Sequence, residues 1–126
     1  MAVKHIHEAP TGNLSRAVVF PLVFVMLMWA VFFLENWGSV SFYQYGIYPR
    51  DVEALPGIIF TPFLHGDWKH IINNSIPILL LGTGIFYFYR EVALKIAIYS
   101  LIITGLWVWV GARPIYHIGA SGVVYA

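Results

Sequence analysis

Three side chains that can take part in acyl transfer lie in or beside apolar stretches of the sequence: His70, Asn74 and Ser121. His70 and Asn74 are four positions apart, so in a helix they share one face, one turn apart. Both side chains can donate hydrogen bonds. Fixed donors aimed at one point can stabilise a developing negative oxygen, as in an oxyanion hole. The alternative is that the two side chains only join neighbouring helices, as His and Asn do in membranes.

Ser121 lies in the small-residue run Gly119-Ala120-Ser121-Gly122, which opens an apolar segment. At the start of a helix, a serine is close to free backbone N–H groups that stabilise negative charge, so Ser121 is a candidate nucleophile. The alternative is a helix N-cap within a packing motif of small residues. The soluble hydrolase motif Gly-x-Ser-x-Gly does not apply, because Val123 occupies its last glycine position.

Three histidines are candidates for a metal site: His65, His70 and His117. Their spacing matches no recognised ligand pattern, and no thiol accompanies them, since the chain has no cysteine. We therefore expect no metal and no other cofactor. His65 precedes the helix of His70 by about one turn, where it could support the site or bind water.

The composition indicates a membrane protein. The chain is 60% hydrophobic and 10% charged, whereas a soluble domain has about 25% charged residues. Such a chain would expose large apolar patches in water. The formal net charge of +1 is too small to indicate nucleic acid, so we expect no such partner.

Three stretches are long and apolar enough to cross a bilayer as helices, which takes about 20 residues. We predict spans at 17–34, 70–89 and 92–110, and the start of a fourth at 121–126. A loop at 35–69, rich in aromatic residues that favour the membrane interface, and a loop at 111–120 connect them. The expected fold class is all-α: a polytopic transmembrane helix bundle. Residues 1–126 would form one membrane domain, truncated at its C-terminus.

Lysine and arginine residues indicate the orientation in the membrane. If the spans alternate, the basic residues divide four against three between the two sides, as Lys4, Arg16, Arg90 and Lys95 against Arg50, Lys69 and Arg113. This small excess favours a cytoplasmic segment 1–16 and an external loop 35–69. We expect the protein to lie in the cell membrane.

Four motifs follow one another along the chain: Gly46-Ile47-Tyr48-Pro49-Arg50, Pro62-Phe63-Leu64-His65, His70-x-x-x-Asn74 and Gly119-Ala120-Ser121-Gly122. Taken together, they resemble the motifs of bacterial-type rhomboid intramembrane serine proteases. The resemblance covers the chain from about residue 46 to residue 126. It implies a core of six transmembrane helices, of which about three and a half are present here, and a serine–histidine dyad inside the membrane.

By motif position, the resemblance implies that Ser121 is the nucleophile. Its backbone N–H and the side chains of His70 and Asn74 would form the oxyanion hole. Supporting or structural residues would be His65, Arg50, Gly119 and Gly122. The family's general-base histidine lies on the sixth helix, so we expect it beyond residue 126, on a longer chain or on a second one. Because a serine without its base is a poor nucleophile, the 126 residues alone are not expected to cleave peptides efficiently.

The expected function is that of an intramembrane serine endopeptidase, with transmembrane protein substrates in a lipid bilayer; the oligomeric state is left open. The alternative is a catalytically inactive rhomboid-like protein that binds transmembrane clients, and the joint presence of Ser121, His70 and Asn74 argues against it. A channel or transporter would show paired ionisable groups within its spans, whereas Lys95 is the one charged residue inside a predicted span.

Overall fold

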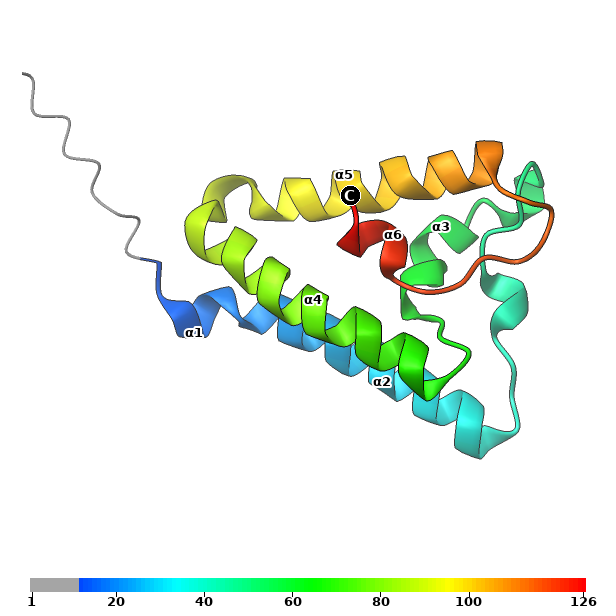
Figure 1. Cartoon of the computed structure of the whole chain (residues 1–126), viewed down its shortest axis with the longest axis horizontal. Coiled ribbons are helices and arrows are strands. Elements are labelled where there is room, and N and C mark those ends of the chain that lie inside the picture. The colour runs from blue at the N-terminus through cyan, green and yellow to red at the C-terminus, as the bar shows by residue number, and fades with distance from the viewer. Residues whose placement is uncertain (1–11) are drawn as a thin grey trace, which may run out of the picture.

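The computed structural model describes residues 12–126, which form a helical bundle (Figure 1). Its long helices are α2 (Val19–Gly38), α4 (Trp68–Phe88) and α5 (Arg90–Gly111). Within the described residues there is no strand, and an isolated antiparallel bridge joins Ile47 to His117. The predicted all-α membrane bundle is confirmed. Residues 1–11, which make up most of the predicted cytoplasmic segment and include Lys4, lie outside the described residues.

In the described part of the chain, three helical stretches are long and apolar enough to cross a membrane: Leu14–Gly38, Trp68–Phe88 and Arg90–Gly111. The first consists of α1 (Leu14–Ala17) and α2, with a turn at Val18. Pro21 accounts for this turn, because it has no N–H to donate to the carbonyl of Ala17. The helix resumes at once, since Leu22 N–H donates to the Val18 carbonyl at 2.9 Å.

The first helix runs four residues beyond the predicted span of 17–34. Glu35 ends the apolar stretch but does not break the helix, and Asn36 Nδ2 donates to the Phe32 carbonyl at 2.8 Å. The helix ends where Ser39 adopts a left-handed conformation with φ 52°. The helix is longer than the apolar stretch because glutamate has a good helix propensity, so Glu35 ends the apolar run without ending the helix.

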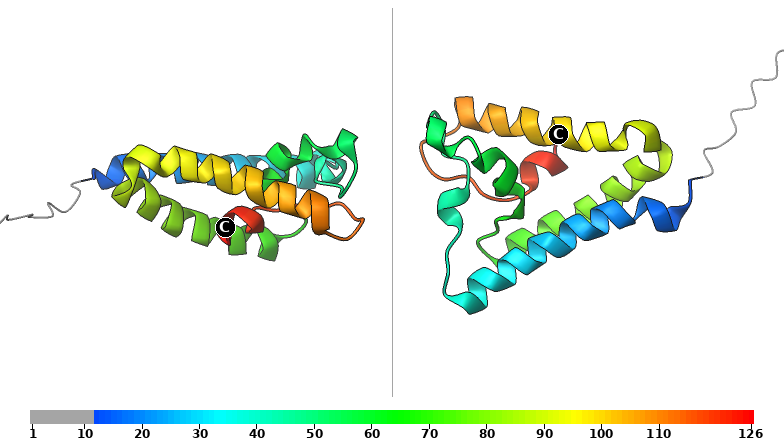
Figure 2. Two further views of the ribbon diagram at one scale, coloured as in Figure 1. Left: turned by 90° about the horizontal axis from the view of Figure 1, so that it is seen from above. Right: turned by 180° about the vertical axis from the view of Figure 1, so that it is seen from behind.

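The bundle has an open triangular outline (Figures 1 and 2). Helices α2 and α4 pack side by side, and α5 returns at an angle from the end of α4. The core between them includes the fully buried Met28 and Phe32 of α2 and Ile71 of α4. A polar link crosses the same interface: Trp29 Nε1 donates to Ser75 Oγ at 3.0 Å, and Ser75 Oγ donates to the Ile71 carbonyl at 2.7 Å.

The connection between α2 and α4 is folded and closes the open end of the triangle (Figure 2). It contains η1 (Tyr43–Tyr45), η2 (Val52–Ala54), α3 (Gly57–Phe60) and η3 (Thr61–Phe63). Helix α3 packs on α5 at Gly105, where a Cβ atom would lie 2.5 Å from Cγ2 of Ile58. Glycine at 105 therefore permits the close approach that holds this connecting segment against the bundle.

Arg50 fastens the connecting segment to the end of α5. Its backbone N–H donates to the Trp109 carbonyl at 2.9 Å. Its guanidinium Nη1 donates to the carbonyls of Val110, at 3.2 Å, and Ala112, at 3.3 Å. In return, Trp109 Nε1 donates to the Asp51 carbonyl at 2.7 Å. These bonds satisfy carbonyls at the C-terminus of α5 that have no partner within the helix.

Thr61 fastens the connecting segment to the loop that leads to Ser121. Ile47 and His117 exchange two backbone hydrogen bonds, of 3.0 and 2.8 Å. The Thr61 hydroxyl donates to the His117 carbonyl at 3.1 Å and accepts from Ile47 N–H at 3.0 Å. The Thr61 carbonyl accepts from Gly119 N–H at 2.9 Å. One buried threonine thus fixes two segments that are far apart in sequence.

We predict that Thr61→Val lowers the free energy of unfolding by about 1–3 kcal/mol, because it leaves buried backbone groups without the hydroxyl. The control Thr61→Ser keeps the hydroxyl and loses a single methyl group, worth about 0.8 kcal/mol. Thermal unfolding of the full-length protein in detergent micelles compares the two variants. Equal melting temperatures for Thr61→Val and the wild type would show that the hydroxyl is not needed.

Candidate active site

The start of α4 positions two of the predicted site residues. Asp67 is the N-cap, and its side chain accepts a hydrogen bond from His70 N–H at 2.8 Å. The helix therefore begins at Trp68, which places His70 in the first turn and Asn74 one turn further on. His70 is half-buried, and Asn74 is 4% exposed.

His70 and Asn74 converge on the backbone of Gly119. A Cβ atom at Gly119 would lie 2.4 Å from His70 Nε2 and 3.6 Å from Asn74 Nδ2. Gly119 also has a φ of +105°, a conformation that residues with side chains rarely adopt. The imidazole and the carboxamide thus meet the chain two residues before Ser121, and glycine is the residue that leaves room for them.

Ser121 is the first residue of the short helix α6 (Ser121–Val124), which packs between α4 and α5. The serine is exposed, whereas the preceding Ala120 is fully buried. Within residues 12–126, the backbone N–H of Ser121 donates no hydrogen bond. Ser121 also lines a cavity of about 110 Å³ that lies between α5, α6 and the connecting segment, with Thr104 and Gly119 among its other lining residues. Its hydroxyl and its N–H are both available to a ligand.

His65 contacts both His70 and Asn74. It is 2% exposed, and its Nε2 atom is 3.0 Å from Nδ2 of Asn74. Its ring packs edge-on against that of His70, with centroids 4.9 Å apart. Burial, and then the nearby His70, lower the pKa of His65 from 6.5 to about 4; the Phe63 carbonyl and Asp67 oppose this shift more weakly. His65 is therefore neutral at neutral pH.

The other predicted residues have different surroundings. Arg50 holds the end of α5, as described above, and Gly122 lies against α5, where a Cβ atom would be 3.3 Å from Thr104 Oγ1. His117 pairs with Ile47 through the backbone. In the part of the chain that the structure describes, no histidine is hydrogen-bonded to Ser121. These residues also gather no group of three or more potential metal ligands.

Thr61 holds the loop before Ser121 in place through hydrogen bonds, and the sequence did not identify this role. Its partners are backbone groups of residues 47, 117 and 119, and backbone groups carry no sequence signal. The available signal was a hydroxyl in the otherwise apolar run from Gly57 to Leu64.

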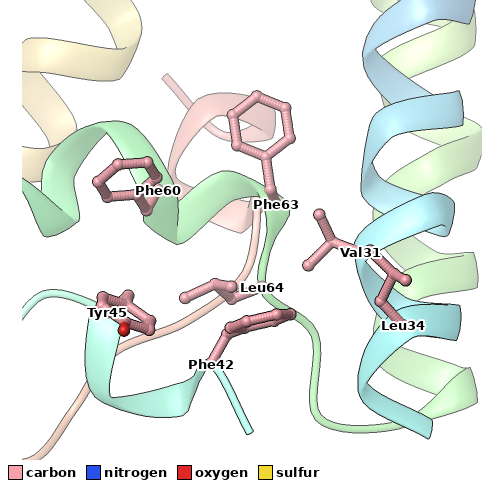
Figure 3. A pocket seen from close by; sticks show the side chains of 7 residues that line it. All are labelled: Val31, Leu34, Phe42, Tyr45, Phe60, Phe63 and Leu64. Atoms are coloured by element: carbon pink, nitrogen blue, oxygen red, sulfur yellow. The ribbon is translucent and has the colours of Figure 1, made fainter. Parts of the chain in front are cut away.

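A larger apolar pocket, of about 390 Å³, lies away from the Ser121 cavity, between α2 and the connecting segment (Figure 3). Val31 and Leu34 of α2 face Phe63 and Leu64 across it. The pocket includes none of the residues His70, Asn74 and Ser121, so it does not belong to the candidate active site.

The fold and the site define a class of protein. It is a multi-pass helical membrane protein in which a histidine and an asparagine lie against a glycine, and an exposed serine comes two residues after that glycine. Comparison with known families identifies that class, because residues 53–126 match the rhomboid domain. The chain belongs to the rhomboid family, which is a family of intramembrane proteases.

Relatives in mycobacteria extend the similarity toward the N-terminus. Uncharacterized proteins of Mycobacterium tuberculosis and Mycobacterium bovis are 34% identical over 115 residues, which cover 82% of this chain and 46% of theirs. An uncharacterized protein of Mycobacterium leprae is 32% identical over 110 residues, covering 82% and 44%. The chain thus spans about half the length of these relatives. No solved structure gives a significant match.

We predict that Gly119→Ala destabilises the protein and displaces His70. The positive φ alone costs about 1–2 kcal/mol for a residue with a side chain, and the new Cβ would overlap the imidazole. The matched control is Gly84→Ala in α4, where the new Cβ meets no atom within 4 Å apart from its chain neighbours and the backbone of its own helix. Thermal unfolding of both full-length variants checks this. A Gly119→Ala protein as stable as Gly84→Ala would contradict the packing described here.

Proposed function

We propose that this protein is an intramembrane serine endopeptidase that cleaves transmembrane segments of membrane proteins, with Ser121 as the nucleophile. The observation that carries the proposal is the convergence of His70 and Asn74 on Gly119, two residues before a serine with an exposed side chain and a free N–H. Membership of the rhomboid family supports it.

In the proposed reaction, Ser121 Oγ attacks the scissile carbonyl carbon while its proton passes to a histidine base. The carbonyl oxygen becomes an oxyanion, which accepts hydrogen bonds from the Ser121 N–H and from the side chains of His70 and Asn74. The intermediate collapses, the amine leaves with the proton from the base, and a serine ester remains. Water then hydrolyses the ester with the same base and releases the acid.

We place the base outside residues 1–126. The imidazoles of the described histidines have other partners: His65 Nε2 lies beside Asn74, His117 Nε2 is 3.1 Å from the Arg113 carbonyl oxygen, and His70 lies beside Gly119 in the proposed oxyanion site. The mycobacterial relatives are about twice as long as this chain, which leaves room for further helices that could carry the base.

We further propose that the protein lies in the cell membrane with its N-terminus in the cytoplasm. The connecting segment and the start of α4 would then be on the outer side, with Ser121 open to water from that side. Irregular backbone such as residues 112–120 is tolerated at membrane depth where protein or a water cavity lines it. The bonds from Thr61 and Ile47 to this loop meet that requirement.

We predict that the full-length protein reacts covalently with a fluorophosphonate probe and that Ser121→Ala abolishes the labelling, because the nucleophilic oxygen is lost. Gel fluorescence after labelling in detergent measures this, and Ser75→Ala serves as a control serine buried between helices. Labelling of Ser121→Ala at the wild-type level would reject Ser121 as nucleophile. A wild-type protein that never labels would favour the alternative, an inactive rhomboid-like protein that binds transmembrane clients.

We predict that His70→Ala and Asn74→Ala each slow turnover by about 10²–10³, the usual cost of removing one oxyanion donor. The loss should appear mainly in kcat, because the donors act on the transition state rather than on bound substrate. The assay is cleavage of a labelled single-span membrane protein in proteoliposomes, with Asn73→Ala, exposed on the next position of α4, as the control. Full activity in both site variants would end the oxyanion assignment.

A further inference from the structure

His65 makes one polar side-chain contact, and that contact is with Asn74. The Nε2 atom is 3.0 Å from Asn74 Nδ2. The Nδ1 atom is buried and, within the described residues, makes no hydrogen bond of good geometry, although the Phe63 carbonyl lies near the ring. Burying an imidazole with a ring nitrogen that lacks a well-formed hydrogen bond costs free energy. An apolar side chain would fill the same space at lower cost, so packing alone does not explain a histidine here.

The contact fixes the plane of the Asn74 carboxamide. Because His65 is neutral, its unprotonated Nε2 can accept one of the two Nδ2 hydrogens. The same Nδ2 atom lies 3.6 Å from the position that a Cβ would take on Gly119, two residues before Ser121. One N–H is held by His65, and the second remains for a ligand at that turn.

We propose that His65 is a positioning residue that aims the second N–H of Asn74 at the oxyanion. Without an acceptor at Nε2, the carboxamide can rotate about its terminal torsion, which is broad and has no strongly preferred angle. The donor would then be present but not fixed, and preorganised donors are the ones that accelerate the reaction. This inference rests on the proposed function.

The test is a double-mutant cycle in the full-length protein, with the rate constant of labelling by a fluorophosphonate probe as readout. This reaction depends on the same nucleophile and oxyanion donors and needs no identified substrate. We expect His65→Leu to slow labelling at least tenfold. We expect His65→Gln, whose Oε1 can accept the same N–H, to stay within about threefold of wild type, taking roughly 0.6 kcal/mol as the limit.

The diagnostic comparison is His65→Leu in the Asn74→Ala background. If His65 acts through Asn74, the double variant labels at the rate of Asn74→Ala alone. If His65→Leu slows labelling by the same factor in both backgrounds, or if His65→Gln is as slow as His65→Leu, His65 has an independent structural role and the inference is overturned. Should His65→Leu fail to fold, His65→Met provides the comparison, since it also lacks the nitrogen acceptor.

The cycle separates this inference from the proposed function. Labelling of Asn74→Ala at the wild-type rate would remove Asn74 from the oxyanion hole, and both proposals would fall. Slow labelling of Asn74→Ala together with an unchanged His65→Leu would leave the oxyanion hole in place and overturn the role of His65 alone.

Discussion

The structure depends on a requirement of the membrane: backbone polar groups that leave a helix at bilayer depth need partners within the protein. Residues 112–120 leave the helix in this way, and in the proposed topology they lie at that depth; their bonds to the connecting segment are made through Ile47, Thr61 and Arg50. These bonds hold the loop against the connecting segment at residues 112, 117 and 119. The last of them fixes the chain two residues before Ser121.

This arrangement explains why the site is assembled from three separate parts of the chain. Helix α4 supplies two side-chain donors, the connecting segment supplies the hydrogen bonds that fix the loop, and the loop supplies Gly119 and Ser121. Each part alone has an ordinary structural explanation, such as a helix cap or a helix contact. Their meeting at Gly119 is the feature that none of those explanations accounts for.

The sequence was informative where side-chain chemistry repeats with a helical period. Apolar length predicted the three spans, and the four-residue spacing of His70 and Asn74 predicted a shared face. The sequence did not predict hydrogen bonds in which a side chain bonds to backbone atoms or to a residue on the far side of a loop. Thr61 bonds to backbone groups up to 58 positions away, and His65 reaches Asn74 across the junction of a loop and a helix. The segment 35–69 was predicted as a loop because its short helical turns are too brief to show a period.

The apolar pocket between α2 and the connecting segment bears on how the protein adapts to its bilayer. Most polar bonds of the connecting segment run to α5 and to residues 112–120, and one runs to α2, from Phe42 N–H to Glu35 Oε1 at 2.6 Å. Val31 and Leu34 face the connecting segment through apolar surface. Apolar contacts are non-directional, so one arrangement can replace another at small cost. A change in the tilt of the first span in a thinner or thicker membrane would be accommodated at this pocket, whereas the Trp29–Ser75 bond and the contact between the Phe32 and Trp68 rings would keep α2 and the start of α4 together.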